Sequence, residues 1–453
     1  MTRLEITRWP IVRSLLIHRW PQVLITSIGL AVFLLAIVAG LLGTPVGNRN
    51  FSIVIVWILW WGLLMLLAVP AFGRAWCSVC PIPAPGEWLQ RGAILRPQGK
   101  GLGLNLRWPR RLRGIWLQNA AFVLLCVFSL VILTNPALTG LVLAGFLLLA
   151  LLTSLTFERR SFCRYLCPVG GFIGLYSQLA PIELRVKDPA VCASHSVKSC
   201  YLGSDAGYGC PWLVYPLTLR KNNSCGLCME CLRTCTEDNI VLQLRPPGAD
   251  LGETSSRRMD EAFKSLIMLG SALLYSGVML GTWGPVKLVG SRVGTAAWFG
   301  YAGGVLGMLL IVLPGFFLLA VAVGKWWSSA TSLRRTFIAQ ATALVPLGLS
   351  AWVAFSLAFV FASASYVFPI LSDPLGLGWN LLGTGAFPWQ PYGMQIVPYM
   401  QIGVLLVGLI WACRTSRQIA GEELAPGAAL RLAAPVSAFS LAVTLGLIGL
   451  LVA

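Results

Sequence analysis

The sequence has few charged residues and almost no histidine. Only 11% of its 453 residues are charged, whereas a soluble globular chain has about 25%, so charge cannot cover a water-facing surface of this size. The 57% hydrophobic content excludes a disordered chain, which needs low hydrophobicity and high charge. The only histidines, His18 and His195, lie outside the long apolar stretches, and a transmembrane b-type haem normally uses histidines at membrane depth. We therefore expect no haem.

Residues for chemistry on a substrate are also scarce. No acid–base pair, nucleophile triad or phosphate-binding loop is apparent, which indicates that substrate chemistry takes place in a partner. No Asp, Glu, Lys or Arg lies well inside a long apolar stretch, whereas proton relays and ion pathways usually contain such residues. This disfavours a pump. Asp373 lies in a loop rich in Gly, Trp and Pro at 368–398, where turn chemistry is its simplest role.

Long charge-free stretches predict transmembrane helices. A helix needs about 20 apolar residues to cross the hydrocarbon core, and these stretches lack the period of two shown by the strands of a β-barrel. Asn135-Pro136 divides one stretch into a helical hairpin, and residues 365–392 allow an added re-entrant piece. Nine spans are expected, at about 22–43, 51–72, 115–134, 138–156, 264–284, 297–322, 337–363, 395–413 and 431–452.

Lys and Arg, which accumulate on the cytoplasmic side of membrane proteins, predict the orientation. With the N-terminus inside, 31 of the 34 basic residues are cytoplasmic, and only Arg49, Lys287 and Arg292 are not. Orientation and attraction to anionic membrane lipid explain the net charge of +18, so no nucleic-acid partner is expected. The sequence predicts a multi-pass protein of a prokaryotic cytoplasmic (inner) membrane, with its C-terminus outside.

Cysteines carry the chemical signal. Of 13 cysteines, eleven lie between Cys77 and Cys235 on segments predicted to be cytoplasmic, where disulfides are rare. Clustered thiols in a reducing compartment indicate a metal. Cys126 and Cys413 each lie alone in an apolar span, where a cysteine usually acts as a small buried hydrophobe.

The segment CGLCMECLRTC has the C-x2-C-x2-C-x3-C spacing of a bacterial ferredoxin. Zinc sites usually show two separated pairs instead, so a [4Fe–4S] cluster is favoured. Thr236 stands where the ferredoxin pattern has proline, and a remote cysteine followed by proline occurs at Cys210-Pro211. The predicted ligands of this cluster are four cysteines: Cys225, Cys228, Cys231 and Cys210.

A second [4Fe–4S] cluster is expected from the remaining thiols of this segment. Cys235 would bind it together with Cys192 and Cys200, which leaves it one protein ligand short. His195, Cys163 and Cys167 are the alternative donors, although a loop histidine is more often simply solvated.

Two further cysteine pairs are each followed by proline and by the end of an apolar span. They are Cys77 and Cys80 before Pro81, and Cys163 and Cys167 before Pro168. At one membrane depth the two pairs would form a four-thiolate metal or redox site, the third in the chain. The alternative is that proline simply ends a helix there and the thiols are idle.

These motifs together resemble the membrane polyferredoxins of the NapH and NosR type, the iron–sulfur subunit of periplasmic nitrate reduction and a membrane protein of nitrous oxide respiration. The resemblance covers about residues 50–245. It implies cluster binding by the 225–235 motif and a role for both cysteine-pair-Pro motifs. The first pair is one residue shorter than the family pattern, the 192–210 half is stretched, and the periplasmic flavin domain of NosR is absent. The five C-terminal spans have no counterpart in the four-span core of the group.

The expected fold is therefore an all-α polytopic membrane protein with a small cytoplasmic ferredoxin-like α+β iron–sulfur insertion. Three domains are predicted: a four-span core at 1–156, the iron–sulfur domain at 157–262, and a five-span region at 263–453. The expected function is electron transfer between a quinol pool or soluble donor and a partner redox protein or enzyme complex, with basic residues stabilising the reduced clusters. The loop at 368–398 is either an interfacial aromatic belt or a docking surface or quinone pocket. A transporter and a redox-sensing or maturation factor are the alternative functions.

Overall fold

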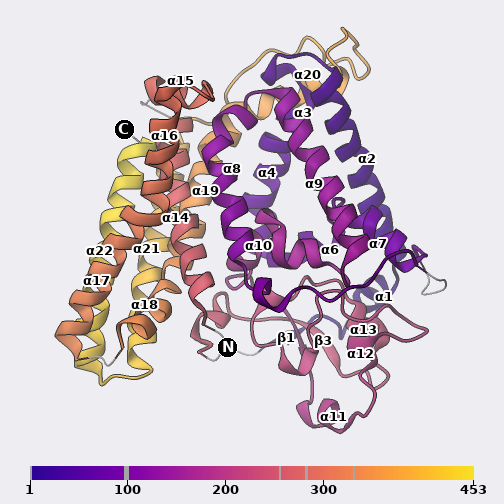
Figure 1. The fold of residues 1–453 in the computed structure, drawn as a ribbon, viewed down its shortest axis with the longest axis vertical. Coiled ribbons are helices and arrows are strands. Elements are labelled where there is room, and N and C mark those ends of the chain that lie inside the picture. Colours follow the sequence, from indigo (N-terminus) through magenta and orange to yellow (C-terminus); the bar gives the residue numbers. More distant parts are fainter. Residues whose placement is uncertain (1–2, 96–100, 255–256, 281–283, 330–331, 453) are drawn as a thin grey trace. The chain divides into compact units, whose positions relative to one another are not determined.

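The computed structural model describes residues 3–95, 101–254, 257–280, 284–329 and 332–452 (Figure 1). The chain divides into two compact units. The first, called the cysteine unit here, comprises Met1–Leu35, Leu67–Gln118 and Leu143–Asp250. The second, the helical unit, comprises Ala36–Leu66, Asn119–Val142 and Leu251–Ala453. These two units interleave along the sequence. The three consecutive domains predicted above stay a prediction.

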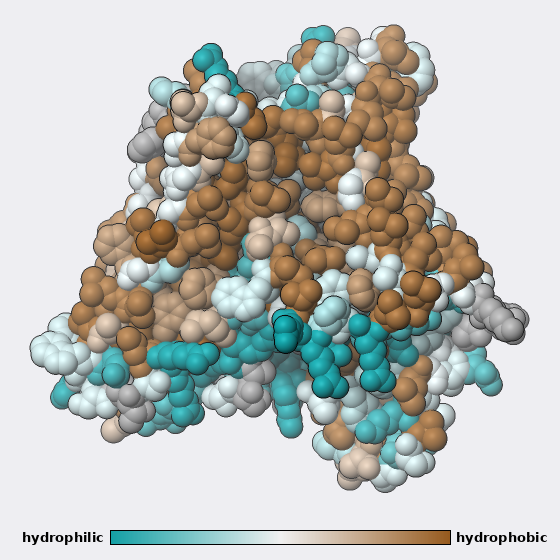
Figure 2. All heavy atoms as spheres, viewed as in Figure 1, coloured by the Kyte–Doolittle hydropathy of each residue, from teal (hydrophilic) through white to brown (hydrophobic). Residues whose placement is uncertain are grey.

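Each of the nine predicted spans falls on a helix. Eight helical segments of the described residues are long and apolar enough to cross a membrane: Trp20–Leu42 (α2), Phe51–Val79 (α3 to α6), Pro136–Thr156 (α9), Met259–Met279 (α14), Ala296–Ser328 (α16 and α17), Leu333–Ser372 (α18 to α20), Val397–Gly421 (α21) and Pro426–Val452 (α22). The ninth, α8 (Trp116–Ile132), is apolar but has only 17 residues. Apolar side chains cover the flanks of the helices in Figure 2. The chain is a multi-pass membrane protein.

Several of these segments consist of shorter helices joined by 3-10 or π-helical turns. The second contains α3 (Phe51–Ile53), α4 (Trp61–Leu63), α5 (Val69–Phe72) and α6 (Trp76–Val79). The later ones contain α16 (Ala296–Gly307), α17 (Leu313–Ser328), α18 (Leu333–Ala341), α19 (Leu344–Ser363) and α20 (Val367–Ser372), and α15 (Gly284–Ser291) precedes them.

The predicted break at Asn135-Pro136 is confirmed. Helix α8 ends at Ile132, and α9 begins at Pro136, whose missing N–H costs nothing at the first helical position. The Asn135 side chain accepts a hydrogen bond from the backbone N–H of Leu138 at 3.2 Å, which caps the new helix. The two residues therefore end one helix and start the next.

Buried polar contacts join the helices of the helical unit. Trp352 on α19 is buried, and its indole N–H donates to the carbonyl of Met268 on α14 at 2.9 Å. Ser416 on α21 donates to the side chain of Gln340 on α18 at 2.7 Å, and the Gln340 amide donates back to the Ser416 carbonyl at 3.2 Å. Such reciprocal pairs satisfy polar groups that would be costly to leave unpaired in an apolar interior.

Helix α14 carries a buried lysine near its N-terminal end. It begins at Met259, five residues before the predicted start of the span, so Lys264 lies inside the helix. Lys264 is fully buried, and its ammonium group lies 5.4 Å from the centroid of the Phe122 ring. Lys264 is the first residue of the predicted span, so the helix extends beyond that span toward the N-terminus.

The loop after α20 is not helical between Asp373 and Ile396. The Asp373 carboxylate accepts from the backbone N–H groups of Leu377 and Gly378 at 2.9 and 2.7 Å. This confirms the turn role predicted for Asp373.

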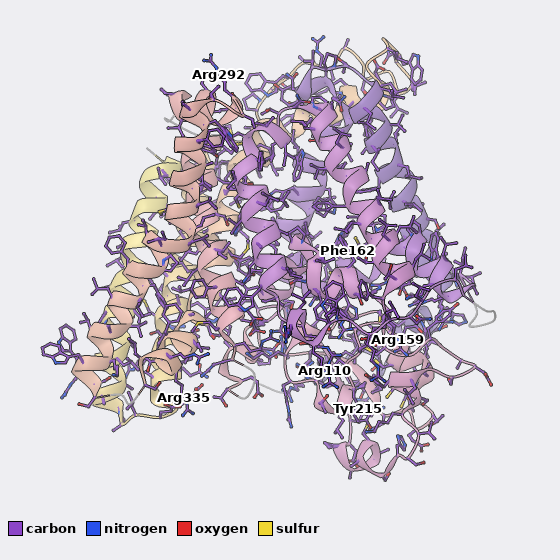
Figure 3. The ribbon with its side chains drawn as sticks, viewed as in Figure 1. Arg110, Arg159, Phe162, Tyr215, Arg292 and Arg335 are labelled. Atoms are coloured by element: carbon purple, nitrogen blue, oxygen red, sulfur yellow. The ribbon has the colours of Figure 1, made fainter. Side chains whose placement is uncertain are left out.

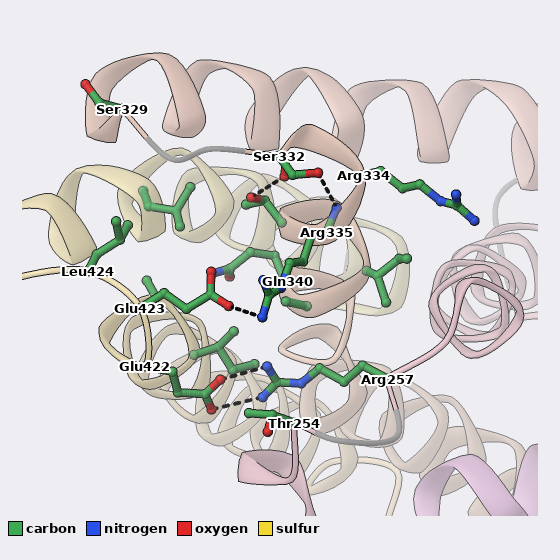
Figure 4. Close-up of a pocket in the computed structure, with 16 residues that line it drawn as sticks. Thr254, Arg257, Ser329, Ser332, Arg334, Arg335, Gln340, Glu422, Glu423 and Leu424 are labelled. Carbon is green, nitrogen blue, oxygen red and sulfur yellow. Dashed lines mark hydrogen bonds and ion pairs between the residues drawn. The ribbon is translucent and has the colours of Figure 1, made fainter.

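A cavity of about 430 Å³ lies in the helical unit beside the turn between α21 and α22 (Figure 4). Arg257 holds Glu422 through two hydrogen bonds of 2.8 and 3.0 Å, and Arg335 pairs with Glu423 at 2.8 Å. Two of its three arginines are thus neutralised within the cavity wall, and these ion pairs tie the turn to α18 and to the segment before α14.

The cysteine unit contains a small antiparallel sheet with strand order β1-β3-β2. Strand β2 (Ile182–Val186) pairs with β3 (Ile240–Leu244), with Leu184 opposite Leu242. The N-terminal strand β1 (Leu4–Glu5) adds to the other edge of β3. The unit's short helices are α1 (Pro10–Ile17), α7 (Ala84–Arg91), α10 (Pro168–Tyr176), α11 (Pro189–Ser194), α12 (Ser199–Leu202) and α13 (Glu230–Thr234). A shared core holds the sheet and the cysteine loops together and contains Leu184, Leu227, Met229, Leu232, Ile240 and Leu242.

Candidate iron–sulfur sites

The ferredoxin-type motif forms a tight loop that leads into α13. Leu227 and Met229 have left-handed backbone conformations, with φ of 49° and 61°, which are strained for residues with bulky side chains. Both side chains are buried in the core beneath the loop. Apolar packing therefore holds the backbone in a turn that brings Cys225, Cys228 and Cys231 together.

Cys210 joins these three cysteines, as its position before a proline predicts. Burial raises the pKa of Cys231 well above its usual value, and the neighbouring Cys228, Cys225 and Cys210 raise it further. Burial likewise raises the pKa of Cys225 to about 11, with Cys210 adding to the rise. Four thiols that disfavour one another's ionisation form a site that a cationic metal centre would relieve.

Cys192, Cys200 and Cys235 form a second group. The side-chain amide of Asn239 donates to the sulfur of Cys192 at 3.2 Å, and its backbone N–H donates to the sulfur of Cys235 at 3.3 Å. Burial raises the pKa of Cys200 to about 11, and Cys235 and Cys192 raise it further. Asn239 was not identified from the sequence, because a single asparagine after the motif gives no signal of its own.

The missing ligand of this second group is not evident from the geometry. The His195 ring lies beside Glu237, 3.9 Å from its carboxylate, and is partly exposed. Cys163 and Cys167, the other predicted donors, interact instead with Cys77 and Cys80.

The third group consists of Cys77, Cys80, Cys163 and Cys167, which lie at the ends of two helices. Cys77 lies on α6, and Cys80 follows its last residue. Cys167 caps α10, and its sulfur accepts a hydrogen bond from the backbone N–H of Gly170 at 3.2 Å. Burial raises the pKa of Cys80 and of Cys163, and the other thiols of the group raise both further. The two pairs meet as the sequence predicts.

Among the described parts of the chain, no three His, Cys, Asp or Glu side chains converge closely enough to hold a single metal. A zinc ion draws its ligands to about 2.0–2.3 Å, whereas the four thiolates of a [4Fe–4S] cube bind four different irons and so lie further apart.

Buried hydrogen-bond donors without an acceptor border the first and third groups. They are Trp212 Nε1, Arg74 Nε and Arg164 Nη1. The Arg74 guanidinium stacks on the Trp212 ring at 4.1 Å, and its charge acts on Cys225 and Cys167. Orphaned buried donors are rare in proteins, and cluster sulfurs accept hydrogen bonds. The residues present therefore fit a [4Fe–4S] cluster.

Further donors fix the backbone around the cysteines. Arg159 and Tyr215 are labelled in Figure 3. Arg159 donates to the carbonyl of Cys210 at 2.6 Å, and the Tyr215 hydroxyl donates to the carbonyl of Cys192 at 2.7 Å. Both orient a loop that carries a candidate ligand.

Gly226 is expected to be essential for this geometry. A Cβ atom at this position would lie 2.0 Å from Trp212 Nε1, far inside contact distance. Gly226→Ala should therefore destabilise the fold by about 1–3 kcal/mol, because the added methyl group overpacks the loop. It should also lower the iron content per purified chain. Gly145→Ala is the matched control, because nothing lies within 4 Å of a Cβ there. Normal iron loading in Gly226→Ala would contradict the tight loop.

Comparisons with known proteins agree with this chemistry. Residues 53–115 and 138–187 match the model of a 4Fe-4S binding domain family, and these ranges contain the two cysteine-pair-Pro motifs. The chain is 29% identical over 103 residues to the "Putative electron transport protein YccM" of Escherichia coli (strain K12). This match covers 22% of the chain and 26% of that protein, so the chain spans about a quarter of the relative's length. No solved structure matches the chain.

The chain thus combines helices long and apolar enough to span a membrane with a region similar to a 4Fe-4S binding domain family.

Proposed function

We propose that the protein relays single electrons through [4Fe–4S] clusters between a quinol pool or a soluble donor and a partner redox enzyme. The observation that carries the proposal is the gathering of eleven cysteines into three thiol groups within one compact unit. A bound [4Fe–4S] cluster supplies a one-electron redox centre. We also propose that the protein is a membrane polyferredoxin of the NapH and NosR type.

Two clusters and a third site are proposed, with the cysteines as ligands. The first cluster uses Cys210, Cys225, Cys228 and Cys231, and the second uses Cys192, Cys200 and Cys235 with one further donor. Cys77, Cys80, Cys163 and Cys167 bind the third metal centre. This third site is supported by the match of both cysteine pairs to a 4Fe-4S binding family.

The protein side chains tune and protect these sites. N–H groups of Asn239 and Gly170 donate to three of the thiol sulfurs, which favours the more negative, reduced state of a centre. Buried apolar residues such as Leu227 and Met229 exclude water from the loop. Together they hold the ligands in place while charge enters and leaves.

Reduction by quinol tests the donor. We expect a short-chain quinol to bleach the cluster absorbance of the anaerobic protein in detergent, and an oxidised quinone to restore it. A protein that dithionite reduces but quinol does not would point to the soluble donor. Failure of both reagents to change the clusters would contradict the relay.

The proposed orientation places the N-terminus and the cysteine-rich segment in the cytoplasm and the C-terminus outside. It is supported by the basic residues, of which only Arg49, Lys287 and Arg292 would face outward. Alkaline phosphatase, which folds only outside the cytoplasm, should be active when fused to the C-terminus and inactive in the loop before α14. The reverse pattern would invert the topology.

A further inference from the structure

A small cavity lies between the first and third thiol groups. Its volume is about 40 Å³, enough for one or a few water molecules. Cys80 of the third group and Cys228 of the first both line it. The two groups therefore approach each other here, within the cysteine unit.

A buried ion pair, Glu87 with Arg160, also lines this cavity. Arg160 donates from Nε to both carboxylate oxygens of Glu87 at 3.1 Å and from Nη2 to one of them at 2.7 Å. Its Nη1 donates to the carbonyl of Cys77 at 2.6 Å. The two side chains are only 6% and 8% exposed, so the guanidinium is fixed in position and screened little by solvent.

Both members of the pair are charged. Burial works to raise the pKa of Glu87, but the charges and hydrogen bonds of Arg160 and Arg91 lower it to about 2. Burial likewise works to lower the pKa of Arg160, but Glu87 raises it above its usual value. With Arg91 also paired to Glu87, this cluster carries one positive charge in excess.

That positive charge acts on thiols of both groups. Arg160 lines the cavity together with Cys80 of the third group, and it is hydrogen-bonded to the backbone of Cys77 in the same group. Cys228 of the first group lines the same cavity. A fixed positive charge beside both centres favours the added electron at each, because reduction is a gain of negative charge.

We propose that Arg160, positioned by Glu87, sets the reduction potentials of the first and third sites together and so keeps them matched for electron exchange across the cavity. This inference rests on the proposed function. Arg160 acts as a positioning charge: its hydrogen bonds reach Glu87 and the Cys77 carbonyl, and its influence on the two centres is electrostatic.

The test is a redox titration of the full-length protein followed by EPR. Arg160→Gln should lower the midpoint potentials of both sites, because a positive charge is lost. Glu87→Gln should shift both in the opposite direction, because it leaves the arginine charge uncompensated. Arg160→Lys should keep both potentials close to those of the unaltered protein. A purely structural role would not shift both sites in one direction in Arg160→Gln and in the other direction in Glu87→Gln.

Arg185→Gln is the matched control. Arg185 influences Cys225 of the first group and pairs with Asp250 at 3.3 Å, so its loss should lower the potential of the first site alone. If Arg160→Gln lacks iron, Glu87→Gln carries the test, since it is isosteric. Unchanged potentials at either site in an iron-loaded Glu87→Gln variant would overturn the inference. An unaltered protein without any redox-active iron would instead refute the proposed function.

Discussion

Replacing Cys228 by alanine is expected to remove one [4Fe–4S] cluster, which is about four iron atoms per chain. Cys228 is buried in the centre of the first thiol group, between Cys225 and Cys231 in the loop and with Cys210 beside it. Loss of one thiolate leaves one iron of a cube without its protein ligand. Iron and acid-labile sulfide should both fall, and one component of the reduced EPR spectrum should disappear.

Cys413→Ala is the matched control for this prediction. Cys413 lies alone on α21 in the helical unit, so its replacement should leave iron and sulfide unchanged. An iron content that is the same in Cys228→Ala and in the unaltered protein would refute the ligand assignment.

Arg245→Ala is expected to destabilise the cysteine unit by about 3–5 kcal/mol, the usual cost of removing one partner from a buried ion pair. Arg245 is completely buried, and its partners Glu183 and Asp250 are only 1% and 3% exposed. It also donates to the carbonyls of Ala180 and Gln178, both at 3.1 Å. Its loss would leave two carboxylates buried beside the sheet, with Arg185 as a partner of both and Arg3 as a further partner of Glu183 alone.

The measurement is the temperature at which the cluster absorbance is lost in detergent. Arg13→Ala is the control, because Arg13 and Asp238 form a pair in the same unit that is 33% and 50% exposed. Such surface pairs contribute about 0–1 kcal/mol, so this variant should melt near the unaltered protein. Equal losses of thermal stability in both variants would contradict the special role of the buried triad.

The sequence predicted the features that depend on local pattern. Charge-free stretches located the helices, and Asn135-Pro136 located the break between α8 and α9, because both signals act within a few turns of helix. The proline after Cys210 singled out the cysteine that the structure brings to Cys225, Cys228 and Cys231. Whether these cysteines bind the cluster as proposed is the subject of the first prediction.

Features that depend on contacts between distant segments were missed. Strand β1 has two residues, too few for a periodic pattern, and it forms only because β3 offers an edge. Glu87 and Arg160 are far apart in the sequence, and neither has a neighbour that marks it as buried. Asn239 is likewise identified only by the two sulfurs that it contacts. Single-sequence patterns do not encode such pairings.

The most direct test of the account is the metal content of the anaerobically purified full-length protein. Iron and acid-labile sulfide are counted per chain, and EPR spectra are recorded after reduction with dithionite. We expect at least about eight iron atoms with a similar amount of sulfide, and coupled signals of reduced [4Fe–4S] clusters. Zinc in place of iron, without sulfide and without an EPR signal, would contradict it.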